Sequence, residues 1–153
     1  MANRFHLAIP AGDLDVAIKF YCELLGCDRG NAEFKYPDAW ADINFWGNEL
    51  TLHATDSNKG KKVERHNVDM GNVSVPHFGV HLDSQTFKNL KERLIRNNIK
   101  FIDPPYIRFK GENKEQETMF IEDPNGNALE IKTMKNPNTL FKDKKWLLII
   151  NLL

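Results

Sequence analysis

Apolar residues recur along the chain in two successive series, and each series changes its period once. The first series begins with a short apolar strand at residues 5–9. Helical spacing follows over residues 14–25, between a capping Asp13 and the helix-ending Gly26. The period then falls to two, first over residues 39–45 and then, after a Gly-Asn turn, over 49–54. This order predicts a strand, a helix and then antiparallel strands.

The second series repeats that order. Its apolar strand begins at Pro76-His77, Asp83 or Ser84 caps the next helix, and Phe87, Leu90 and Leu94 give that helix its spacing. An Asn125-Gly126 pair marks a hairpin turn near the end of the series. The strands after the helix are predicted at residues 100–102, 106–110, 117–121 and 128–133.

Two similar series indicate an internal repeat and an α+β fold. We predict a first module over residues 1–55, a polar linker over 56–73 and a second module over 74–134. Residues 135–153 form a tail whose apolar run at 146–150 favours burial, for example on a dimer surface. Two curved half-sheets with outer helices would leave a cup between them.

Composition and charge limit the classes of partner that we expect for the 153-residue chain. Lysine plus arginine equals aspartate plus glutamate at 21 each, so no net field attracts nucleic acid or an anionic membrane. No apolar stretch reaches the roughly 18 residues of a membrane span, and the first residues do not resemble a signal peptide. The C-x4-C spacing of Cys22 and Cys27 fits neither a zinc knuckle nor a redox pair. We therefore predict a cytoplasmic protein with a small-molecule partner.

Four potential metal ligands fall on strand faces away from the apolar packing. His6 and His77 occupy matching places in the two series, Glu130 lies between two apolar neighbours in the last strand, and His53 lies in the earlier hairpin. Two imidazoles and a carboxylate suit Fe²⁺, Mn²⁺, Ni²⁺ or Zn²⁺. The alternative for each residue is an ordinary solvated strand position.

These residues resemble the vicinal oxygen chelate superfamily, which includes glyoxalase I, fosfomycin and bleomycin resistance proteins and extradiol dioxygenases. The resemblance runs from Phe5 to Thr133, and its most specific part is the Asp-Pro-Asn-Gly-Asn turn that leads to Glu130. The Pro-His-Phe-Gly-Val stretch from Pro76 is most similar to predicted extradiol-dioxygenase-type proteins. The resemblance implies a βαβββ module in each half and a metal in the cup.

The resemblance also implies a ligand set of His6, His77 and Glu130, the two histidines and one glutamate of the extradiol pattern. Glyoxalase I requires a further glutamate in the first half. Four residues after the turn glycine, this chain has Thr51 in the first half and Glu130 in the second. His53 lies two residues beyond Thr51 and is expected either as a fourth ligand or as an acid/base.

The resulting hypothesis is a dioxygenase-like enzyme that binds a small substrate through adjacent oxygens, with Fe²⁺ or Mn²⁺ favoured over Ni²⁺ or Zn²⁺. His53 or His81 would move a proton, and Tyr106, with Arg108 beside it, would contact the substrate. Glyoxalase-type isomerisation or thiol transfer on the same scaffold is one alternative, and non-catalytic drug binding is another. The sequence leaves open whether the modules pair within one chain or across a homodimer.

Overall fold

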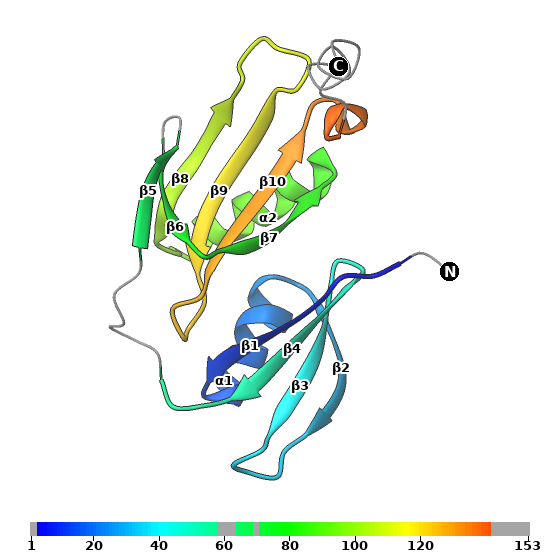
Figure 1. Cartoon of the computed structure of the whole chain (residues 1–153), viewed down its shortest axis with the longest axis vertical. Helices are drawn as coiled ribbons and strands as arrows, with labels where there is room; N and C mark the ends of the chain where they lie inside the picture. Colours follow the sequence, from blue (N-terminus) through cyan, green and yellow to red (C-terminus); the bar gives the residue numbers. More distant parts are fainter. Residues whose placement is uncertain (1–2, 58–63, 69–70, 142–153) are drawn as a thin grey trace, which may run out of the picture.

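The computed structural model describes residues 3–57, 64–68 and 71–141. These residues form two four-stranded sheets, each with a helix on one face, and a separate two-stranded hairpin (Figure 1). The strand order is β1-β4-β3-β2 in the first sheet and β7-β10-β9-β8 in the second. The α+β class and the paired βαβββ modules expected from the sequence are therefore confirmed.

The first module follows the predicted order, with one additional strand. Asp13 caps the helix by accepting from the Val16 amide, and the α-helix passes directly into a π-helical turn. The elements are β1 (His6–Gly12), α1 (Leu14–Lys19), η1 (Phe20–Leu24), β2 (Asp28–Glu33), β3 (Trp40–Phe45) and β4 (Asn48–Ala54). β1 pairs with β4 in parallel, and the other strands pair antiparallel.

The second module repeats this topology. Asp83 caps its helix by accepting from the amides of Gln85 and Thr86. The elements are β7 (Phe78–Leu82), α2 (Ser84–Arg96), β8 (Phe101–Arg108), β9 (Gln116–Glu122) and β10 (Ala128–Met134). β7 pairs with β10 in parallel, as β1 does with β4. Each helix covers one face of its own sheet, so the opposite face carries the side chains available for chemistry (Figure 1).

Two strands differ from the sequence expectation. β2 is an edge strand with almost every residue exposed, so its sequence Asp-Arg-Gly-Asn-Ala-Glu lacks the apolar alternation that marks other strands. β8 was expected as two pieces and is one edge strand with register shifts around Asp103 and before Tyr106. Pro104 and Pro105 lie in that irregular stretch. Proline has no amide hydrogen to donate to a neighbouring strand, so it is tolerated where the regular hydrogen bonding of the sheet is already interrupted.

The segment predicted as a polar linker contains secondary structure. β5 (Glu64–Val68) and β6 (Gly71–Val75) form an antiparallel hairpin beside β8. The Arg65 guanidinium lies 3.7 Å from the Asp103 carboxylate, and a side chain at Gly71 would meet the Tyr106 hydroxyl. The hairpin therefore covers the outer edge of the second sheet.

The two modules share a hydrophobic core and a polar latch. The latch consists of Asp123, Asn125 and Asn127 in the turn before β10: both asparagine side chains donate to the Pro10 carbonyl at 2.8 Å. Tyr21 from η1 donates to Asp123 at 2.9 Å, where both groups are buried. Burial and the Asp123 carboxylate raise the pKa of Tyr21, which keeps its hydroxyl a donor. The Asp-Pro-Asn-Gly-Asn turn thus joins the modules as well as reversing the chain.

A short helical turn, η2 (Pro137–Thr139), follows the second module. The apolar run at 146–150 and most of the predicted tail lie outside the described residues. Among the described residues, no helix combines the length and apolar character needed to cross a membrane.

Candidate metal centre

Glu130 is the buried carboxylate at the centre of the second sheet. It lies in the middle of β10, is 5% exposed, and is opposite Gly79 on β7 and Phe120 on β9. A side chain at Gly79 is excluded, because its Cβ would lie 1.7 Å from the Glu130 carbonyl oxygen. The glycine in Pro-His-Phe-Gly-Val therefore allows β7 to approach the strand that carries Glu130.

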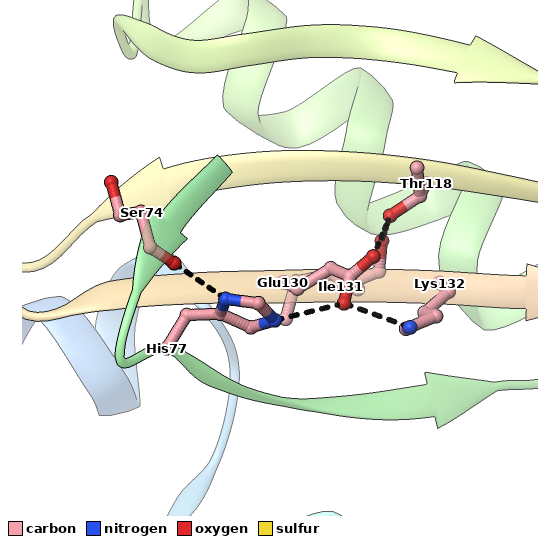
Figure 2. A network of polar contacts seen from close by, with 6 residues as sticks. All are labelled: Ser74, His77, Thr118, Glu130, Ile131 and Lys132. Carbon is pink, nitrogen blue, oxygen red and sulfur yellow. Dashed lines mark hydrogen bonds and ion pairs between the residues drawn. The ribbon is translucent and has the colours of Figure 1, made fainter. Parts of the chain in front are cut away.

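His77 lies just before β7 and is held in one orientation. Its Nδ1 lies 2.6 Å from the Ser74 carbonyl oxygen, which can only accept, so Nδ1–H is the donor. The other ring nitrogen, Nε2, faces Glu130. Nε2 lies 3.3 Å from Glu130 Oε2, so a nitrogen donor and a carboxylate oxygen converge (Figure 2).

Two further side chains hold the Glu130 carboxylate. The Thr118 hydroxyl donates to Oε1 at 2.8 Å, and the Lys132 ammonium lies 2.8 Å from Oε2, the oxygen that also faces His77 (Figure 2). A buried carboxylate requires such partners, because burial of an unpaired charge costs several kcal/mol of stability. Removal of one partner from a buried ion pair typically destabilises a protein by about 3–5 kcal/mol. Lys132 therefore supplies a compensating charge for Glu130.

The first half arranges its candidate ligand differently. His6 Nδ1 lies 3.4 Å from Glu49 Oε2, and both side chains are more than half exposed. Thr51, the counterpart of Glu130 by position, is paired with Ala8 in the ladder and donates to Asp42 at 2.8 Å. Across the described ranges, no three histidine, cysteine, aspartate or glutamate side chains come together as a set of metal ligands. The chain thus brings His77 and Glu130 together and places His6 with Glu49.

The predicted acid/base residues lie at different distances from this pair. His53 is exposed on β4 opposite Trp40, four residues beyond Glu49, or roughly 13 Å along the strand. His81 on β7 is opposite Lys132. Partial burial and the Lys132 charge lower the pKa of His81, while Glu130 raises it. His81 therefore belongs to the sheet that carries Glu130, whereas His53 belongs to the other sheet.

Tyr106 shares a ladder row with His81. The pairs His81–Lys132, Lys132–Thr118 and Thr118–Tyr106 cross all four strands of the second sheet. On β7, β9 and β10 this row lies two residues from the row that contains Glu130, and on the same face. Proton-transfer and substrate-binding candidates therefore lie beside the carboxylate.

A cavity of about 330 Å³ lies between the modules. Its walls include Leu7, Phe45 and Glu49 from the first module and His77 and Phe78 from the second. Because Glu49 contacts His6, this cavity adjoins both histidine–glutamate pairs. Its size and partly apolar lining suit a small molecule.

His77 and Glu130 together supply two of the donors that a divalent metal would need. A fixed imidazole and a desolvated carboxylate, each with a further hydrogen bond that orients it, are features of metal sites in proteins. The Lys132 ammonium lies on Glu130 Oε2, the same oxygen that faces His77. The residues that would hold the metal are His77 and Glu130, with one or more donors added to them.

Four contacts of the centre were absent from the sequence analysis: the Ser74 carbonyl, Glu49, Thr118 and Lys132. The contact of Lys132 could have been predicted from the sequence, because Lys132 lies two residues after Glu130 in a strand and therefore on the same face. Thr118 depends on the register between β9 and β10, and Ser74 depends on the turn before β7. The sequence alone does not specify either feature.

Comparison with known proteins places the chain in a family. Residues 4–131 match the model of the Glyoxalase/Bleomycin resistance protein/Dioxygenase superfamily. A glyoxalase/bleomycin resistance protein/dioxygenase from Alicyclobacillus acidocaldarius is similar at 33% identity and a TM-score of 0.68, over 91% of this chain and 96% of that one. Comparison with curated proteins gives no match.

Two more distant structures share the fold. A domain of the same description from a Frankia species has 18% identity and a TM-score of 0.64, with 91% of this chain and 96% of that chain covered. The fosfomycin resistance protein FosX from Listeria monocytogenes has 12% identity and a TM-score of 0.61, with 87% and 93% covered. With its paired modules and the family match over residues 4–131, the chain belongs to the glyoxalase/bleomycin resistance protein/dioxygenase superfamily.

Proposed function

We propose that the chain is a metal-dependent enzyme with dioxygenase-like chemistry on a small substrate that presents two adjacent oxygens. The observation that carries this proposal is the convergence of His77 Nε2 and the buried Glu130 carboxylate at 3.3 Å. The Ser74 carbonyl, 2.6 Å from Nδ1, fixes the imidazole in this direction. The cavity beside His77 provides space for the substrate.

His77 and Glu130 would hold the metal, and His6 would complete the set. When bound, Fe²⁺ or Mn²⁺ supplies a Lewis acid and a template for adjacent substrate oxygens. Ni²⁺ or Zn²⁺ would instead favour isomerase or transferase chemistry of the glyoxalase type. His6 can come from the same chain, after leaving Glu49, or from a second copy in a homodimer.

The residues proposed for proton transfer and substrate binding lie in the row of paired strand residues beside Glu130. The lowered pKa of His81 keeps its imidazole neutral near pH 7, so it can accept a proton from the substrate. Tyr106 orients the substrate on the same face. His53 lies farther along the first sheet and serves as a fourth ligand only if the cup closes over it.

Elemental analysis of the protein purified without an affinity tag tests this proposal. The wild type should carry about one divalent metal per site, and His77→Ala and Glu130→Ala should lose it. His81→Ala is the matched control, because it removes an imidazole four residues after His77 without removing a proposed ligand. His81→Ala should keep the metal and lose turnover.

The same variants locate the third donor. His6→Ala should also lose metal. A mixture of His6→Ala and Glu130→Ala chains, unfolded and refolded together, recovers metal only if each site combines two copies. A wild type that takes up no metal after reconstitution would overturn the enzyme proposal and favour ligand sequestration in the cavity.

A further inference from the structure

The cavity between the modules has an aromatic lining that the proposed metal chemistry does not explain. Three phenylalanine rings line it: Phe5 before β1, Phe45 at the end of β3 and Phe78 at the start of β7. Phe5 is 65% exposed and Phe45 is 4% exposed, so the rings extend from the open side of the cavity to its buried side. The ring centroids of Phe45 and Phe78 lie 5.7 Å apart, so both modules contribute to one aromatic wall.

A single carboxylate supplies the charge of this lining. Among the described residues that line the cavity, Glu49 is the only aspartate, glutamate, lysine or arginine. Its side chain is 52% exposed, and its Oε2 lies 3.4 Å from His6 Nδ1. Exposed pairs of this kind are weak, so a ligand with a positive charge can replace His6 as the partner of Glu49.

The lining offers few hydrogen-bond donors to an anion. The side chain of Asn48 is engaged at both ends: Oδ1 accepts from the Phe5 amide at 3.3 Å, and Nδ2 donates to the Phe45 carbonyl at 3.4 Å. His77 directs its Nδ1–H to the Ser74 carbonyl. The described polar groups of the lining therefore favour a positively charged ligand over a negatively charged one.

We propose that this cavity binds a small organic cation, with its ammonium group between the Glu49 carboxylate and the phenylalanine rings and its apolar body inside the cavity. An aromatic ring attracts a cation over its face, and a carboxylate adds an opposite charge. A volume of about 330 Å³ suits one small molecule.

The inference deepens the proposed function and rests on it in one respect, namely that the cavity holds the substrate. It gives that substrate a cationic end in addition to its adjacent oxygens. The cation subsite itself requires no metal, so it can be tested in the metal-free protein.

Titration of the chelator-treated full-length chain with benzyltrimethylammonium tests the subsite by protein-observed NMR. The amide of Gly79, which lines the cavity, is the reporter of position. The wild type should bind this cation with a Kd of about 0.1–1 mM, and it should bind phenylacetate, an anion of similar size, about tenfold more weakly. Equal or tighter binding of phenylacetate would overturn the proposal, as would cation binding that leaves the Gly79 signal unmoved.

Two glutamate variants test the role of the charge. Glu49→Gln removes the charge and keeps the shape, so it should weaken cation binding by about three- to fivefold. Glu64→Gln is the matched control, because Glu64 forms another exposed pair, with His66 at 3.1 Å on β5, and is not among the residues that line the cavity. Glu64→Gln should bind the cation as the wild type does. Unchanged affinity in Glu49→Gln would overturn the proposal.

The aromatic contribution is tested by Phe78→Leu, which keeps an apolar side chain and removes the ring. Cation binding should weaken by about threefold, while phenylacetate binding stays the same. If Phe78→Leu does not fold, the exposed Phe5 is changed to leucine instead. Unchanged cation affinity in the folded variant would contradict the proposal, because apolar contact alone would then account for binding.

His6→Ala distinguishes this proposal from the metal site. The change removes a proposed metal donor but keeps the carboxylate and the rings, so cation binding should persist, and its loss would contradict the subsite. A wild type that takes up no metal but binds the cation overturns the enzyme proposal and supports the subsite. A wild type that holds metal and binds no cation overturns the subsite alone.

Discussion

The two modules have the same topology and register but place their carboxylates differently. Ala8 is opposite Thr51 in the first sheet, and Gly79 is opposite Glu130 in the second. The first half has an exposed pair of His6 and Glu49, more than half open to solvent. In the second half the carboxylate is buried, with an imidazole, a hydroxyl and an ammonium around it.

This difference shows how a repeated scaffold can concentrate chemistry in one half. Water weakens the interaction between exposed charges, so the pair in the first half contributes little by itself. Burial in the second half strengthens every interaction with Glu130 and fixes the side chain in one place. The first half can still supply His6, a donor that does not need burial to bind a metal.

The largest effect is expected from Gly79→Ala. The added Cβ would lie 1.7 Å from the Glu130 carbonyl, so β7 must move away from β10. We expect a loss of about 3 kcal/mol or more in the free energy of unfolding, measured by urea denaturation. The reciprocal change at the matching position, Ala8→Gly, should cost only about 1 kcal/mol. Equal losses at the two positions would show that the modules do not differ in strand approach.

A smaller effect is expected from the contact that joins the modules through Tyr21. Tyr21→Phe removes a buried hydrogen bond to a carboxylate and leaves Asp123 with one donor fewer. The expected cost is about 2 kcal/mol by urea denaturation. Lys91→Met is the comparison, since Lys91 lies eight residues after its own capping aspartate, as Tyr21 does.

Lys91 makes a partly exposed ion pair within its own module, so its loss should cost about 0.5 kcal/mol. A Tyr21→Phe protein as stable as the wild type would mean that the hydroxyl contact adds nothing to the joining of the modules.

The smallest effect is expected from a comparison of Thr118 with Thr51. Thr118 donates to Glu130, and Thr51 donates to Asp42, both at 2.8 Å. Thr118→Val should weaken Zn²⁺ binding by about tenfold, because the ligand loses an orienting hydrogen bond. Thr51→Val should leave Zn²⁺ affinity unchanged in the same calorimetric titration. An equal loss in both variants would place Asp42 and Thr51 at the metal as well.

The sequence predicted the repeat and the helices because their periodicity is strong and local. The faces of His6, His77 and Glu130 were predictable for the same reason, since alternation along a strand fixes them. β2 was missed because it is an exposed edge strand, and the hairpin β5–β6 was missed because it lies in a polar segment. Neither has the buried face that produces a pattern.

The contacts of the centre were less predictable than its residues. The sequence placed His6, His77 and Glu130 in one set, but the chain pairs only His77 with Glu130. Which strand edges meet is determined by packing between modules, and no local pattern encodes that packing. The role of the Asp-Pro-Asn-Gly-Asn turn as a latch was hidden for the same reason, because its partner Pro10 lies in the other module.

The latch joins two parts of the chain that are synthesised far apart in time. Its bonds from Asn125 and Asn127 to Pro10 join residues 115 and 117 positions apart, whereas the β3–β4 hairpin closes within a few residues. Short loops close first because they lose less entropy. Until residues 123–127 are made, the first module lacks its latch, and the Tyr21 hydroxyl lacks its Asp123 acceptor. Chain truncation before residue 123 would leave that nascent module without the cover on which its final stability depends.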